Sequence, residues 1–198
     1  MKILFITPSY KPAYIYGGTI VAVSTLAERL VRLGNIVTVY TTRANGNTEL
    51  DVVAGAETMV EGVKVIYFNR VTKDHTHVSF ALWKHLDKTI NQFDVVHIHS
   101  WWNLLVIGSA WICRRRGINP VLSPHGMFSE FILNHQNRRK KKLIHFLVGR
   151  GLLEGTFLHV STQMEWSESL KMNPKWDGRI IPNLIKLGEI ELSNRAAG

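Results

Sequence analysis

Hydrophobic positions along the chain alternate between short runs rich in β-branched residues and longer stretches with apolar residues at helical spacing. The short runs predict strands at residues 2–6, 36–41, 63–68, 94–99, 120–123, 156–161 and 179–182. The longer stretches predict helices at residues 19–33, 80–90, 103–116, 135–153 and 163–172. Between them, polar residues 43–61 predict a long loop, and residues 187–198 lose periodicity and predict a linker or frayed end.

This order of elements predicts the fold class. Strands that are apolar almost throughout, alternating with helices, are typical of a parallel sheet covered on both faces. We therefore expect one α/β domain with a doubly wound, mostly parallel, Rossmann-like sheet of about seven strands. In such sheets ligands bind at the carboxyl ends of the strands, where the strand order reverses, so functional residues are expected directly after strands.

Composition adds bounds to this picture. The chain has 198 residues, 45% hydrophobic and 20% charged, which is typical of a soluble globular domain. No apolar run is long enough to span a membrane and no signal-peptide core is present, so we expect a cytoplasmic protein. The single cysteine, Cys113, excludes an internal disulfide, and its apolar neighbours favour buried packing over a nucleophilic role.

The chain is basic, with a formal net charge of +9. A basic face can meet nucleic acid, an anionic membrane or phosphorylated substrates. The densest run lies in the predicted helix 135–153 and comprises Arg138, Arg139, Lys140, Lys141 and Lys142. Apolar residues follow it, so this helix suits an anionic membrane surface, although a solvated basic face packed by its apolar side needs no lipid.

The loop after the first predicted strand ends in Gly17-Gly18, where a helix begins. Glycines at a helix start let backbone N–H groups approach a phosphate, whereas a tight loop without a ligand would use the same residues. The loop lacks the Gly-x-Gly-x-x-Gly pattern of dinucleotide-binding folds, which counts against a nicotinamide enzyme.

The fourth predicted strand ends in His97-Ile98-His99-Ser100-Trp101-Trp102. The two histidines share one face of the strand, but no neighbouring Cys or acidic pair completes a metal site, so we expect no metal. His99, nearer the carboxyl end, is a candidate sugar or acceptor contact, with a satisfied core histidine as the alternative. Trp101 and Trp102 are candidates to stack on a sugar ring, and one of the two is expected to cover the sheet edge instead.

The fifth predicted strand is followed by His125-Gly126-Met127. A histidine between a strand and a glycine is placed to contact a ligand, and a loop histidine that only bonds the backbone is the alternative. Gly126 and Met127 are candidate contacts in the same loop.

Five segments together resemble glycosyltransferase family 4 over nearly the whole chain. They are KILFITPSYKPAYIYGGTIVAVSTLAERLVRLGNIVTVYTT, DVVHIHSWWN, SPHGMFSEFILNHQNRRKKK, HVSTQMEWSESL and RIIPN. The stretch 125–142 is most similar to members that build bacterial surface polysaccharides. The resemblance implies the GT-B arrangement, in which two Rossmann-like domains face each other across a cleft, and implies a hexosyltransferase that retains anomeric configuration without a metal or other cofactor.

Position by position, the resemblance implies roles for particular residues. Gly17 and Gly18 match the loop beside the donor diphosphate, and His125 matches the histidine near the donor sugar and the reaction centre. Ser161 and Glu165 match a strand-end serine and acid that we expect to be structural or to line the cleft. Pro182-Asn183 matches the hinge, where Leu184 departs from the small residue that is usual in the family.

The resemblance also implies a division of labour. Residues 1–183 correspond to the N-terminal, acceptor-side domain and residues 184–198 to a hinge, linker or truncated tail, while the C-terminal nucleotide-sugar domain is absent. The expected partners are a nucleotide sugar shared with that domain, a glycan or lipid-linked acceptor in polysaccharide or glycolipid biosynthesis, and an anionic membrane surface, but no nucleic acid. The alternative is a non-catalytic Rossmann-like module that binds an anionic ligand, nucleic acid or a membrane.

Overall fold

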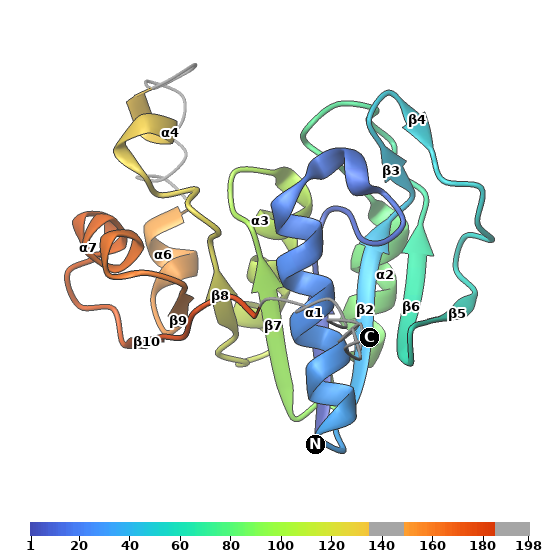
Figure 1. Ribbon diagram of the computed structural model, residues 1–198, viewed down its shortest axis with the longest axis horizontal. Helices are drawn as coiled ribbons and strands as arrows, with labels where there is room; N and C mark the ends of the chain where they lie inside the picture. The colour runs from blue at the N-terminus through green and yellow to red at the C-terminus, as the bar shows by residue number, and fades with distance from the viewer. Residues whose placement is uncertain (135–148, 185–198) are drawn as a thin grey trace, which may run out of the picture.

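A computed structural model describes residues 1–134 and 149–184, which form an α/β domain around one large sheet (Figure 1). Within these residues the sheet has eight strands in the order β10-β9-β8-β7-β1-β2-β6-β5. They are β1 (Lys2–Ile6), β2 (Ile36–Thr42), β5 (Glu57–Val60), β6 (Val63–Phe68), β7 (Val95–His99), β8 (Val121–Ser123), β9 (Phe157–Val160) and β10 (Gly178–Ile180). A separate antiparallel pair is formed by β3 (Ala44–Asn45) and β4 (Thr48–Glu49).

Helices connect these strands. The longer ones are α1 (Gly18–Arg32), α2 (Phe80–Thr89), α3 (Leu104–Arg115) and α7 (Gln163–Met172). Short ones are α4 (Glu130–Asn134), α6 (Arg150–Leu153) and the 3-10 turns η1 (Tyr14–Tyr16) and η2 (Ile90–Gln92). Asn103 caps α3 as expected, because its side chain accepts a hydrogen bond from the Val106 N–H at 2.9 Å.

All seven predicted strands are present and pair in parallel with one another in the sheet, so the predicted fold class is confirmed. The predicted loop at residues 43–61 was wrong in part, because it contains β3, β4 and the antiparallel edge strand β5. A two-residue turn joins β5 to β6, with φ of 48° at Glu61 and 82° at Gly62. Positive φ at both positions is typical of the hairpin turn that matches strand twist.

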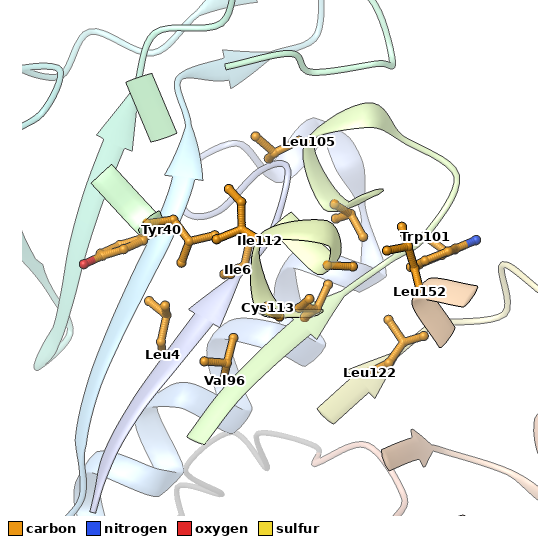
Figure 2. Packing of buried hydrophobic residues seen from close by; sticks show 14 of the residues in the cluster. Leu4, Ile6, Tyr40, Val96, Trp101, Leu105, Ile112, Cys113, Leu122 and Leu152 are labelled. Atoms are coloured by element: carbon orange, nitrogen blue, oxygen red, sulfur yellow. The ribbon is translucent and has the colours of Figure 1, made fainter. Parts of the chain in front are cut away.

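The two faces of the sheet carry separate cores, and β1 contributes to both. Leu4 and Ile6 face a cluster with residues of α2 and α3, while Ile3 and Phe5 face a cluster with α1. Figure 2 shows the first cluster, in which Cys113 is buried as expected and burial raises the pKa of its thiol to about 12. Helix α1 lies on one face and α2 and α3 lie on the other (Figure 1), which is the doubly wound arrangement.

Candidate active site

The strands β1, β7 and β8 are parallel neighbours, so the loops that follow them lie at the same edge of the sheet. The strand order reverses at β1, beside these loops. Strands β2 and β6 lie to one side of β1, whereas β7 and β8 lie to the other. These loops comprise residues 7–17, 100–103 and 124–129. Ligands of parallel α/β sheets bind at this kind of reversal, and all the predicted strand-end site residues lie in or beside these loops or at the start of α1.

The loop after β1 is held by a buried lysine. The Lys11 ammonium is paired with the carboxylate of Glu28 on α1 and, at 2.9 Å, with that of Glu61. The Tyr67 hydroxyl donates a hydrogen bond to the Lys11 carbonyl oxygen, and burial raises the pKa of this hydroxyl to about 12. These contacts were not predicted, because the partners lie 17, 50 and 56 residues from Lys11.

The same loop ends at the predicted glycine pair. Gly17 precedes α1 with φ of 67°, and Gly18 is the first residue of the helix. Both glycines are exposed, so this helix start is open to an approaching anion such as a diphosphate. A side chain at Gly17 would be strained by its positive φ even though the space around it is open.

His125 lies after β8 in a left-handed backbone conformation that non-glycine residues adopt at a cost. Its φ is 51°, and that of Gly126 is 75°. Such strain is found mainly at functional sites and persists only where neighbours hold the backbone in place. Burial lowers the pKa of the half-buried His125 ring to about 4, so the imidazole is neutral at pH 7.

The carboxylate of Glu165, on α7, holds the backbone around His125. It accepts hydrogen bonds from the Gly126 N–H at 2.7 Å, from the Ser161 N–H at 2.8 Å and from the Ser161 hydroxyl at 3.0 Å. Hydrogen bonds to a carboxylate are stronger than neutral ones. Glu165 therefore ties the loop after β8 to the end of β9, which agrees with the structural role expected for it and for Ser161.

His99 lies directly behind His125. Its Nδ1 is 3.1 Å from Nε2 of His125, and its ring is stacked on His97 with centroids 4.1 Å apart. The ring is fully buried and also contacts Phe5, 4.6 Å between centroids. Burial and the neighbouring histidines lower the pKa of both His97 and His99 well below the usual range of histidine. His99 therefore reaches the loop edge only through His125.

A further set of hydrogen bonds crosses the sheet from His97. Its Nε2 lies 2.8 Å from the Ser123 hydroxyl, which lies 3.0 Å from Nδ1 of His159. Nε2 of His159 in turn lies 3.1 Å from the Ile181 carbonyl oxygen. Neither Ser123 nor His159 was a predicted site residue, although both face the same side of the sheet as His97.

The two tryptophans have different environments. Trp101 is 1% exposed and packs on Phe128 in the core, the role expected for one of the pair, so it is not available to stack on a sugar. Trp102 is half-buried, and its indole N–H donates to the Met127 carbonyl oxygen at 2.6 Å. Of these residues, Trp102 and the half-buried Met127 remain candidate ligand contacts beside His125.

The other predictions concern the basic run and the membrane. Arg138, Arg139, Lys140, Lys141 and Lys142 lie outside the described residues, as do 185–198. Among the residues that are described, no helix is long and apolar enough to cross a membrane. The described ranges also contain no group of three or more His, Cys, Asp or Glu side chains placed to hold a metal ion.

Comparisons with known proteins relate the sequence and the fold of this chain to a family. The family model described as Glycosyltransferase Family 4 matches residues 16–187. The Anabaena HepE protein, solved in complex with UDP and glucose, matches with a TM-score of 0.59 and 14% identity, over 93% of this chain and 45% of that one. Sucrose-phosphate synthase from Thermosynechococcus elongatus matches with a TM-score of 0.58 and 16% identity, over 92% of this chain and 48% of that one.

The chain thus spans about half the length of these two solved structures. None of the curated proteins compared with it matches by sequence. At these identities the structural matches establish the fold, which is that of one half of a GT-B glycosyltransferase, and the family model covers most of the chain. The chain belongs to glycosyltransferase family 4.

Proposed function

We propose that this domain is the acceptor-binding half of a retaining glycosyltransferase that moves a hexose-type sugar from a nucleotide sugar to a hydroxyl acceptor in polysaccharide or glycolipid biosynthesis. The other half would be a nucleotide-sugar domain that faces the loops after β1, β7 and β8. Membership in family 4 supports the transfer chemistry, and the similarity to a protein solved with UDP and glucose supports a nucleotide-sugar donor.

The observation that carries the proposal is the strained loop of His125. A neutral imidazole stands at the strand reversal, on backbone with positive φ that the Glu165 carboxylate holds in place. A neutral ring suits a hydrogen bond to a sugar hydroxyl. It is a poor general base in this setting, because burial disfavours the imidazolium that proton abstraction would create.

The remaining site residues take supporting roles in this proposal. The exposed Gly17 and Gly18 at the start of α1 face the donor diphosphate, where backbone N–H groups and the helix dipole favour negative charge. Trp102 and Met127 border the acceptor beside His125. No residue is assigned to a metal or other cofactor, which is what the family resemblance implies.

Sugar transfer by the gene product that contains this domain with its nucleotide-sugar half tests the proposal. Release of free nucleotide and appearance of labelled sugar in a polysaccharide or lipid fraction should both require His125. Product with the inverted anomeric configuration would contradict retention. Absence of transfer from every common nucleotide hexose, by a protein shown to be folded and to contain both halves, would contradict the whole proposal.

We further propose that an anionic membrane surface is a partner, if the acceptor is lipid-linked. The net charge of +9 and the basic run at residues 138–142 support this proposal. Co-sedimentation with anionic vesicles should weaken with added salt and when Arg138, Arg139 and Lys140, Lys141 and Lys142 are made neutral. Equal binding to neutral and anionic vesicles would remove the electrostatic basis of the idea.

A further inference from the structure

The ring of His99 has a hydrogen-bond partner at only one of its two nitrogens. Nδ1 lies 3.1 Å from Nε2 of His125. Nε2 is buried and has no hydrogen-bond partner within the described part of the chain. Because the side chain is 0% exposed, it cannot touch a ligand itself, and any effect it has on a substrate must pass through His125.

This asymmetry decides which ring donates in the contact between the two histidines. A neutral imidazole carries one N–H and one bare nitrogen. If His125 donated from Nε2, His99 would carry its proton on the buried Nε2, where no acceptor lies within the described residues. If His99 donates from Nδ1, the buried Nε2 is only a bare lone pair. Buried N–H groups without an acceptor are rarer in proteins than acceptors without a full set of donors.

We propose that His99 is a positioning residue, which donates its Nδ1–H to Nε2 of His125 and so fixes His125 as the Nδ1–H tautomer. Nε2 of His125 is then occupied as an acceptor, and its free polar group is the Nδ1–H. His125 therefore offers a substrate oxygen a hydrogen-bond donor and offers no lone pair to take a proton. This consequence for the substrate rests on the proposed function, whereas the tautomer does not.

The surroundings hold His99 in the orientation that this requires. Its ring lies against His97, 4.1 Å between centroids, and against Phe5, 4.6 Å between centroids. A flip of the imidazole would exchange Nδ1 for carbon in the contact with His125 and would break the 3.1 Å hydrogen bond. Because the ring is stacked and buried, the main alternative orientation is reached by rotation of the imidazole about its Cβ–Cγ bond. The hydrogen bond to His125 opposes this rotation.

The neighbouring hydrogen bonds fix His97 by the same reasoning. The Ile181 carbonyl oxygen can only accept, so Nε2 of His159 carries the proton of that hydrogen bond, and in this Nε2–H tautomer Nδ1 is an acceptor. The Ser123 hydroxyl then donates to His159 and accepts from Nε2–H of His97. His97 and His159 are thus expected as Nε2–H tautomers, opposite to His99 and His125.

Nuclear magnetic resonance of the 198-residue chain tests the assignment directly. Long-range ¹H–¹⁵N correlation spectra at pH 8 distinguish protonated from bare ring nitrogens, and single substitutions assign each ring. We expect Nδ1–H for His99 and His125 and Nε2–H for His97, with the exposed His75 as an internal reference for a ring that exchanges freely between tautomers. An Nε2–H signal for either His99 or His125 would overturn the proposal.

Two substitutions separate positioning from packing. His99→Phe keeps a ring in the stack but has no donor, so His125 should become a mixture of tautomers. His99→Asn places an amide N–H near the former Nδ1 and should keep His125 as Nδ1–H. If His125 stays Nδ1–H in His99→Phe, His99 does not set the tautomer and the proposal is wrong. If His99→Phe does not fold, the spectrum of the unsubstituted chain still decides.

A catalytic readout follows in the two-domain enzyme. His99→Phe should lower kcat about tenfold with little change in KM for the acceptor, and His99→Asn should recover most of the loss. If His99 had a purely structural role, both variants would lose stability equally and kcat per folded molecule would be unchanged. That result would contradict the positioning role. Failure of the proposed function appears differently, as absence of transfer in the unsubstituted enzyme while the tautomers are still as expected.

Discussion

Replacement of Glu165 by glutamine tests how the loop of His125 is held. The glutamate is 7% exposed, and both of its carboxylate oxygens accept hydrogen bonds. Oε1 accepts from the Gly126 N–H, and Oε2 accepts from the N–H and hydroxyl of Ser161. Glutamine has nearly the same shape but only one acceptor oxygen. Whichever way its amide is turned, an NH₂ group faces one of the two backbone donors.

The magnitude follows from this mismatch. A buried donor left without its acceptor costs about 1–3 kcal/mol, and a hydrogen bond to a charged group contributes more than a neutral one. The Ser161 hydroxyl can rotate and accept from the new amide, which recovers part of the loss. We therefore expect Glu165→Gln to lower the free energy of unfolding by about 2–3 kcal/mol.

Urea unfolding of the 198-residue chain, followed by circular dichroism, measures this difference. Glu168→Gln is the matched control on the same helix, because within the described residues Glu168 accepts one hydrogen bond, an exposed one from the Glu130 N–H at 3.3 Å. Its expected cost is below about 0.5 kcal/mol. Amide exchange at Gly126 should accelerate in Glu165→Gln and not in the control. Equal stabilities of the two variants would refute the idea that Glu165 holds this loop.

Three further predictions concern activity and pH. The purified 198-residue chain should not turn over any nucleotide sugar, because half of the proposed cleft is missing, and any turnover in a nucleotide-release assay contradicts this. In the proposed two-domain enzyme, His125→Ala should lower kcat about a hundredfold and keep the fold, whereas His97→Ala should mainly lower the thermal midpoint. Near-normal turnover of His125→Ala would show that another strand end is the important one. The pKa of His77 is lowered to about 4 by burial, and those of His97 and His99 lie well below the usual range. Below about pH 6.5 the unfolded chain therefore binds more protons than the folded chain, so the contribution of these histidines to the free energy of unfolding is fully present only above that pH. The free energy of unfolding should fall by about 1.4 kcal/mol per histidine on acidification to about pH 5.5. Unfolding curves that coincide at about pH 7.5 and 5.5 would contradict buried neutral rings.

The sequence by itself determined the main elements and the edge of the sheet at which the candidate site lies. The short apolar run at 36–41 predicted a strand, observed as Ile36–Thr42, and the helical spacing at 103–116 predicted a helix, observed as Leu104–Arg115. Because apolar strands alternate with helices along the chain, a parallel sheet with helices on both sides is the arrangement that buries both faces of the strands. Because carboxyl ends of parallel strands share one edge, the place of His125 beside the strand reversal followed without any long-range contact.

Pairings between distant residues were decided only by the tertiary structure. The edge strand Glu57–Val60 has a half-polar pattern that gives little local signal, and its pairing with Val63–Phe68 makes it a strand. Trp101 and Trp102 are adjacent in sequence, yet one is buried in the core and the other borders the His125 loop.

The contacts around His125 have the same origin. Glu165 lies 39 residues from Gly126, and His99 lies 26 residues from His125. Strand register fixes these encounters: β7 and β8 place His99 opposite Ser123, two residues before His125. Periodicity in sequence reports which side of a strand a residue occupies, but only the registered sheet determines which neighbour it meets there, and hydrogen bonds and tautomers depend on that neighbour.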